Sequence, residues 1–172
     1  MEIKGYVACI TEGAAERAII DLLLDNHVLC FERSDLLDEE IITCRNARVF
    51  ESRYLRKSFS KDITVIRVLD SRREVFKLSK AYEGKVSVIN VVTAPEIEML
   101  IILNENRYDH YKKMNMKPSE YCKAVLKFKN VKSYDFVKNY FSDIRTLLNA
   151  IDRYAKVTKP RKGEYTLKDI CT

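Results

Sequence analysis

Three acidic residues, Glu12, Asp70 and Glu98, stand at or just beyond the ends of apolar segments that we interpret as strands. The carboxyl ends of parallel strands meet at one edge of a sheet, and ligands bind beyond that edge. We therefore expect the three carboxylates to converge on one site. Carboxylate oxygens suit Mg²⁺ or Mn²⁺. The five cysteines form no C-x-x-C pair and only two histidines are present, which favours buried reduced thiols over zinc or disulfides.

Each of these acids also has a purely structural interpretation. Glu12 can stabilise the amino end of the helix that follows it, and Asp70 can cap the next helix. Glu98 can be an ordinary solvated helix residue. Glu96 lies three residues after Thr93, which is the spacing of a capping box, and we therefore leave Glu96 outside the site.

Basic residues near the acids favour phosphate as the ligand. Arg72 and Arg73 closely follow the second of the three acids, and a guanidinium group can engage two phosphate oxygens at once. Further along the chain, we expect Lys112, Lys113 and Lys117 to hold additional phosphate groups.

The elements that must position these side chains alternate between strands and helices. Strands that are apolar on both faces imply a mainly parallel, four-stranded sheet with helices on both sides, which is an α/β fold. We expect the strands over residues 5–11, 27–31, 63–70 and 85–93, and helices over residues 12–26, 71–84, 94–106 and 133–157.

The charge distribution divides the chain into an α/β domain over residues 1–106 and a basic helical extension over residues 107–172 that packs on it. The extension holds 16 Lys and Arg against 7 Asp and Glu, whereas the first 106 residues hold 15 against 18. Such a basic part favours either a lysine-rich surface or phosphate binding. The sequence shows neither a membrane-spanning apolar run nor a signal-peptide pattern, which predicts a cytoplasmic protein without a membrane partner.

Two segments of the chain resemble Toprim-domain proteins. The segment ITEGAAERAIIDLLLDN resembles the opening Toprim motif, a strand that ends in Glu-Gly before a helix, and its E-G-x-x-E spacing is closest to that of OLD-type nucleases. The segment TAPEIEMLIIL resembles the S-N-P-x-F-E-x-W-L-L segment of RloB-like proteins, with Pro95 and Glu98 on the Pro and Glu of that family. The resemblance covers roughly residues 4–106 and includes the order of the motifs.

The resemblance implies a Toprim-like sheet and a Mg²⁺-dependent (or Mn²⁺-dependent) nuclease that cleaves DNA or RNA, with a role in phage defence. In the family, the first-strand Glu acts in acid/base chemistry and a D-x-D pair holds the metal ion. Carried over to this chain, Glu12 and Asp70 are the catalytic residues, and they bind the metal together with Glu98. Arg72 occupies the position of the second Asp of the pair.

Several alternatives remain open at this point. Glu74 or Asp35 can supply the missing oxygen ligand instead of Glu98. If Asp70 and Arg72 form an ion pair, the chain is a non-catalytic Toprim module that binds nucleic acid or a partner protein, such as a companion ATPase. A third possibility is an α/β domain for a nucleotide or phosphate ligand, although neither G-x-G-x-x-G nor a P-loop sequence is present. The apolar last helix also offers a face for a homo-oligomer.

Overall fold

A five-stranded, all-parallel β-sheet forms the centre of the computed structural model, which describes residue 3 and residues 5–72 and 75–172. The strand order is β2-β1-β3-β4-β5. The three central strands pair along most of their lengths, and a two-residue strand extends the sheet at each edge. The strands are β1 (Tyr6–Thr11), β2 (Ile42–Thr43), β3 (Ile63–Leu69), β4 (Val86–Val92) and β5 (Glu164–Tyr165). The α/β class and the parallel sheet are thus confirmed, with five strands instead of the predicted four.

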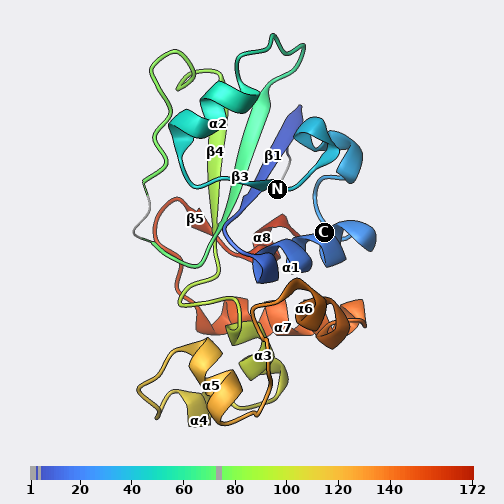
Figure 1. Cartoon of the computed structure of the whole chain (residues 1–172), viewed down its shortest axis with the longest axis vertical. Helices are drawn as coiled ribbons and strands as arrows, with labels where there is room; N and C mark the ends of the chain where they lie inside the picture. The colour runs from blue at the N-terminus through green and yellow to red at the C-terminus, as the bar shows by residue number, and fades with distance from the viewer. Residues whose placement is uncertain (1–2, 4, 73–74) are drawn as a thin grey trace.

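The helices lie over the faces of the sheet and beyond the carboxyl ends of its strands (Figure 1). Helix α2 covers one face, whereas α3 to α7 are gathered below the strand ends in this view. The helices are α1 (Ala14–Asp25), α2 (Ala47–Tyr54), α3 (Met99–Asn104), α4 (Tyr108–Tyr111), α5 (Pro118–Ala124), α6 (Tyr134–Tyr140), α7 (Ile144–Val157) and α8 (Leu167–Ile170), with short 3₁₀ turns at Arg33–Asp35 and Leu37–Glu39.

Two hydrophobic layers explain why the central strands are apolar at nearly every position. Cys9 and Ile66 point to the larger layer, which contains the apolar side chains of α1, α3, α6 and α7. Ala8 and Val65 point to the smaller layer, which contains Phe50 of α2. Because successive side chains of a strand point to opposite faces, a strand covered on both sides needs apolar residues in both registers.

The extension formed by residues 107–172 is continuous with the sheet. Its strand β5 pairs in parallel with β4, helix α7 packs on α3, and α6 packs on α1. The Tyr154 hydroxyl of α7 donates a hydrogen bond to the backbone oxygen of Ala94, at 2.6 Å. Of the apolar residues expected to dock the end of the chain, Leu167 and Ile170 are fully buried, whereas Tyr165 is 38% exposed.

Two of the predicted elements are wrong. Residues 27–31 do not form a strand of the sheet, because the chain turns directly after α1 and Leu29 makes only an isolated antiparallel bridge with Cys171. The helix predicted over 71–84 is not formed in its described parts, residues 71–72 and 75–84, and Leu78 instead packs into the smaller hydrophobic layer. Tertiary packing overrides local helical propensity at this place.

Two other predicted helices are shorter than expected. The segment 133–157 is divided into α6 and α7, because the Asp143 side chain accepts a hydrogen bond from the backbone N–H of Arg145 and starts a new helix. The helix predicted over 94–106 begins only at Met99. The residues before it make contacts with distant parts of the chain: the Thr93 hydroxyl donates to the backbone oxygen of Leu69, and the Glu96 carboxylate accepts from the backbone N–H of Ser119.

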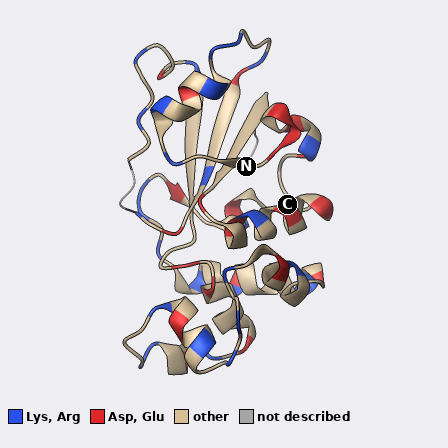
Figure 2. Cartoon of the chain, in the orientation of Figure 1, with Lys and Arg blue, Asp and Glu red and all other residues tan. Residues whose placement is uncertain are grey.

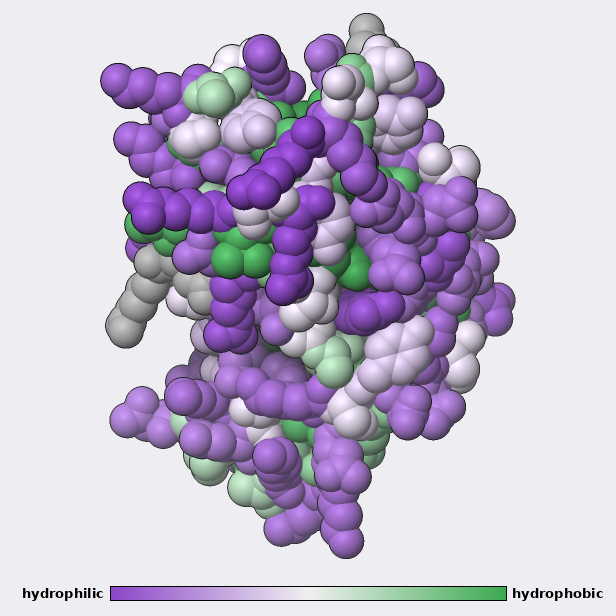
Figure 3. Space-filling model, turned by 45° about the horizontal axis from the view of Figure 1, so that its top comes forward, coloured by the Kyte–Doolittle hydropathy of each residue, from purple (hydrophilic) through white to green (hydrophobic). Residues whose placement is uncertain are grey.

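The charged residues are spread over the molecular surface. Lys and Arg occur on segments of both the sheet and the helical part in Figure 2, and acidic segments lie between them. On the face shown in Figure 3, hydrophilic side chains cover most of the surface and hydrophobic ones form small separate patches. Within the described part of the chain, each helix is too short or too polar to cross a bilayer.

Candidate functional site

The strand order locates the edge of the sheet where a ligand is expected. The connection from β1 through α1 leads to β2 on one side of β1, whereas β3 lies on its other side, so the order reverses between β1 and β3. In open α/β sheets, ligands bind beyond the carboxyl ends of the strands at such a point. Glu12 directly follows β1 and Asp70 directly follows β3, so two of the predicted acids are at this position.

An open cleft of about 830 Å³ lies beyond the ends of β3 and β4. It includes three of the predicted site residues, Asp70, Arg72 and Lys117. The remaining charged groups of the cleft, Glu96, Glu120 and Arg161, carry no sequence motif that assigns them to this site. The cleft is lined by Asp70, Ser71, Arg72, Ala94, Pro95, Glu96, Tyr111, Asn115, Met116, Lys117, Pro118, Glu120 and Arg161.

The other predicted phosphate-binding residues lie outside the lining of this cleft. Lys112 forms an ion pair with Asp109, with 2.9 Å between Nζ and Oδ1, and its ammonium lies over the Tyr108 ring. Lys113 is exposed just after α4. Arg73, like the alternative ligand Glu74, falls outside the described residues.

Arg72 is bound to the C-terminal part of the chain. Its Nε lies 3.1 Å from both carboxylate oxygens of Glu164 in β5, and its Nη2 donates to the backbone oxygen of Lys159 at 3.3 Å. The ion pair that the structure describes for Arg72 is therefore with Glu164, and the pair considered with Asp70 is replaced by one that ties β5 to the end of β3.

The E-G-x-x-E motif brings Glu16 to the edge of the sheet. The Glu16 side chain folds back over the start of α1, and a Cβ atom on residue 13 would lie 2.7 Å from Glu16 Oε2. Glu16 is 6% exposed. Burial raises its pKa, a hydrogen bond from its own backbone N–H opposes that shift, and the charge of Asp70 adds to it.

Glu96 is part of this edge, although its sequence spacing suggested a capping box. Its Oε2 accepts a hydrogen bond from the backbone N–H of Ser119 at 2.8 Å, and its Oε1 lies 2.9 Å from Nζ of Lys132. The Thr93 hydroxyl donates to the backbone oxygen of Leu69 instead. Burial opposes ionisation of Glu96, but the bonds from Ser119 and Lys132 outweigh it and lower the pKa of Glu96.

Glu98 is not among the residues that line the cleft, and it is not a solvated helix residue. It is 2% exposed and borders a small apolar space lined by Ile97, Ile101 and Val131, among others. Burial raises the pKa of Glu98 to about 7, against a hydrogen bond from its own backbone N–H and the charge of Lys132.

In the part of the chain that the structure describes, these acids do not form a group of three metal ligands. Among residues 3, 5–72 and 75–172, no three side chains of His, Cys, Asp or Glu lie close enough together to share a metal ion. Asp35, the alternative ligand, instead accepts a hydrogen bond from the backbone N–H of Glu32 in a 3₁₀ turn. The binding of Mg²⁺ by these acids therefore stays a prediction.

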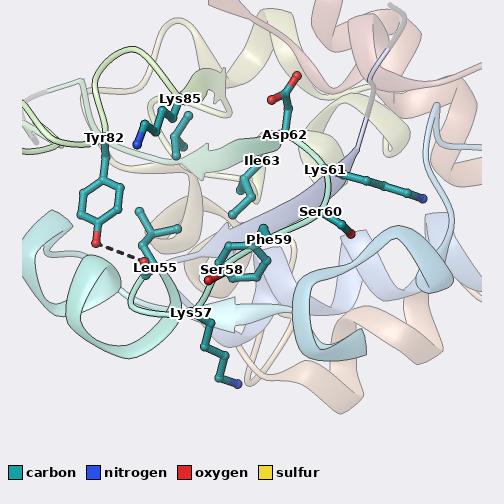
Figure 4. A pocket seen from close by; sticks show the side chains of 11 residues that line it. Leu55, Lys57, Ser58, Phe59, Ser60, Lys61, Asp62, Ile63, Tyr82 and Lys85 are labelled. Carbon is teal, nitrogen blue, oxygen red and sulfur yellow. Dashed lines mark hydrogen bonds between the residues drawn. The ribbon is translucent and has the colours of Figure 1, made fainter.

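A second hollow, of about 650 Å³, lies at the opposite edge of the sheet, at the amino ends of β3 and β4. Its walls include Lys57, Lys61 and Phe59, and the Tyr82 hydroxyl donates to the backbone oxygen of Leu55 at 3.1 Å (Figure 4). The side chains of Lys57 and Lys61 point away from the hollow in different directions. These cations do not converge on a ligand, so the cleft at the carboxyl edge is the better candidate site.

The fold and the cleft define an α/β protein with a five-stranded parallel sheet and a charged cleft at its carboxyl edge. Comparisons with protein-family models, with curated proteins and with solved structures found no significant match in any of the three. The Toprim and RloB-like assignment thus continues to rest on the resemblance of the sequence segments and stays a prediction.

Proposed function

We propose that the cleft at the carboxyl edge binds the phosphodiester backbone of a nucleic acid strand. Lys117 and Arg161 are exposed and line the cleft together with Arg72. Such cations bind phosphate oxygens, and Tyr111 at the same cleft offers an aromatic ring on which a base can stack. The observation that carries the proposal is this grouping of three cations and an aromatic ring in one open cleft at the edge where α/β proteins bind ligands.

Acidic residues in the cleft determine how the strand would lie. Asp70, Glu96 and Glu120 share the lining with the cations, and Glu96 is already paired with Lys132. A nucleic acid strand would therefore contact Lys117 and the other cations of the cleft, and Asp70 would lie beside the phosphodiester backbone of that strand. Cleavage of the Toprim type is the second candidate function. It is favoured because Glu12 and Asp70 follow neighbouring, directly paired strands.

The binding proposal can be tested by fluorescence anisotropy with labelled single-stranded DNA and RNA oligonucleotides. The double variant Lys117→Ala/Arg161→Ala should weaken binding by about tenfold or more and reduce the slope of log K against log salt by about 2. The double variant Lys57→Ala/Lys61→Ala removes the same charge at the opposite edge of the sheet and should leave both quantities nearly unchanged. Equal losses in the two variants, or the lack of any binding by the unmodified protein, would refute the proposal.

The same oligonucleotides also test for cleavage. They are incubated with the protein in Mg²⁺, Mn²⁺ or EDTA and separated on denaturing gels. Metal-dependent products that disappear in Glu12→Gln and Asp70→Asn would support the nuclease that the resemblance implies. Products that survive both substitutions would exclude these residues as the catalytic groups. A role in phage defence and a companion ATPase follow from the resemblance alone.

A further inference from the structure

Lys132 forms an ion pair with Glu96 and acts electrostatically on three further acids at the carboxyl edge of the sheet. Glu16 lies in the first turn of α1, Asp70 follows β3, Glu96 and Glu98 follow β4, and Lys132 comes from the extension just before α6. The charge of Lys132 lowers the pKa of Glu16 and Glu98, against burial as the largest influence on each. In turn, burial lowers the pKa of Lys132, but its hydrogen bond with Glu96 and the charges of Glu98 and Asp70 raise it above the ordinary value. One protonated ammonium therefore interacts electrostatically with all four acids.

The contacts around Lys132 hold its ammonium in place. Nζ lies 2.9 Å from Oε1 of Glu96, whose other oxygen is fixed by the backbone N–H of Ser119. On the two sides of Lys132 in the chain, Val131 is fully buried in the larger hydrophobic layer and Ser133 caps α6. Although the Lys132 side chain is 52% exposed, both its backbone and its carboxylate partner are fixed.

Grouped carboxylates at this edge need a positive charge, because like charges that lie close together disfavour ionisation. A divalent ion supplies that charge in a magnesium site. Here an ammonium is already within ion-pair distance of Glu96, and it would repel a second cation placed among the same oxygens.

We infer that Lys132 is the resident cation of this acid cluster. Its ammonium balances the negative charge of the carboxylates and prevents divalent metal ions from binding among them. The inference goes beyond the proposed function, since it concerns which cation the cluster holds and is valid whether or not the cleft binds nucleic acid. It departs from the D-x-D metal site that the resemblance implies, and it predicts that any ligand binding to the cleft is independent of Mg²⁺.

The test is direct titration of the full chain with Mn²⁺, followed by the loss of the electron paramagnetic resonance signal of free Mn²⁺. Lys132→Met removes the charge while keeping an unbranched side chain. It should gain one Mn²⁺ site with an affinity at least about tenfold higher than that of the unmodified protein. Lys132→Arg keeps the charge and should bind Mn²⁺ as weakly as the unmodified protein does.

Lys138→Met is the matched control for the loss of one positive charge. Lys138 lies in α6 and forms a similar ion pair with Asp25, with 2.8 Å between Nζ and Oδ2, but Arg33 also pairs with Asp25 and would still compensate it. Lys138→Met should therefore gain no Mn²⁺ site. The inference would be overturned if Lys132→Met bound Mn²⁺ no better than the unmodified protein, or if Lys138→Met gained as much.

A measurement on the unmodified protein covers the case in which Lys132→Met does not fold. A metal ion that binds the folded state raises the melting temperature through linkage. Thermal unfolding in millimolar Mg²⁺ or Mn²⁺ should match unfolding in EDTA at equal ionic strength. A clear rise in melting temperature together with stoichiometric Mn²⁺ binding would show that the cluster takes a metal ion with Lys132 present and would refute the inference. Neither measurement involves nucleic acid, so failure of the proposed function would be seen separately.

Discussion

The substitution Glu98→Gln is expected to stabilise the protein at neutral and alkaline pH. Glu98 is 2% exposed and borders apolar side chains, so its ionised form is poorly solvated in the folded state. Burial, opposed by a hydrogen bond from its own backbone N–H and by the charge of Lys132, raises its pKa from the ordinary 4.5 to about 7. Glutamine has nearly the same shape and does not titrate.

The magnitude and sign follow from the difference in pKa between the folded and unfolded states. An acid with a raised pKa binds more protons when the protein is folded, so stability falls as the pH rises from 4.5 to about 7. One pKa unit corresponds to about 1.4 kcal/mol. Ionisation of Glu98 thus lowers the free energy of unfolding by about 3 kcal/mol above pH 7 and has no such effect below pH 4.5.

Urea unfolding followed by circular dichroism, repeated across this pH range, measures the effect. The free energy of unfolding of Glu98→Gln minus that of the unmodified protein should grow by about 3 kcal/mol as the pH rises from the acid to the alkaline end of the range. Glu40→Gln, a substitution of an exposed glutamate, should show no such growth. Parallel pH profiles for Glu98→Gln and the unmodified protein would refute the conclusion that burial disfavours the ionised form of Glu98.

Three further substitutions test the fold by urea or thermal unfolding. Gly5 and Gly163 have φ angles of +84° and +83°, but only at Gly5 would an added Cβ collide with the backbone oxygen of Asp62. Gly163→Ala should therefore cost about 1 kcal/mol and Gly5→Ala at least about 3 kcal/mol, and equal losses would contradict the described contact. Tyr154→Phe removes the hydrogen bond to the backbone oxygen of Ala94 and should cost about 1 kcal/mol, whereas an unchanged stability would show that this bond contributes little.

Local patterns in the sequence were sufficient where neighbouring residues determine the structure. The strand β1 and the helix α1 follow from an apolar run and a helical spacing, and both are confirmed. The capping box was wrong because the partners of Glu96 are Ser119 and Lys132, which are 23 and 36 residues away along the chain. Spacing within a motif carries no information about contacts of that kind. Lys132 has no distinguishing pattern around it, and only the folded chain shows which acids it meets.

The same long-range contacts bear on what the basic extension does. At the carboxyl edge, Lys132 of the extension compensates Glu96, while Glu164 of the extension holds Arg72 at the end of β3. Arg72 after β3 and Glu96 after β4 therefore have counter-ions that come from residues beyond 106. A strand-terminal acid can be a metal ligand, a helix cap or half of an ion pair, and its own sequence context does not decide among them. In this chain the choice depends on the extension, which supplies β5, part of the cleft and the lysine that meets the acids.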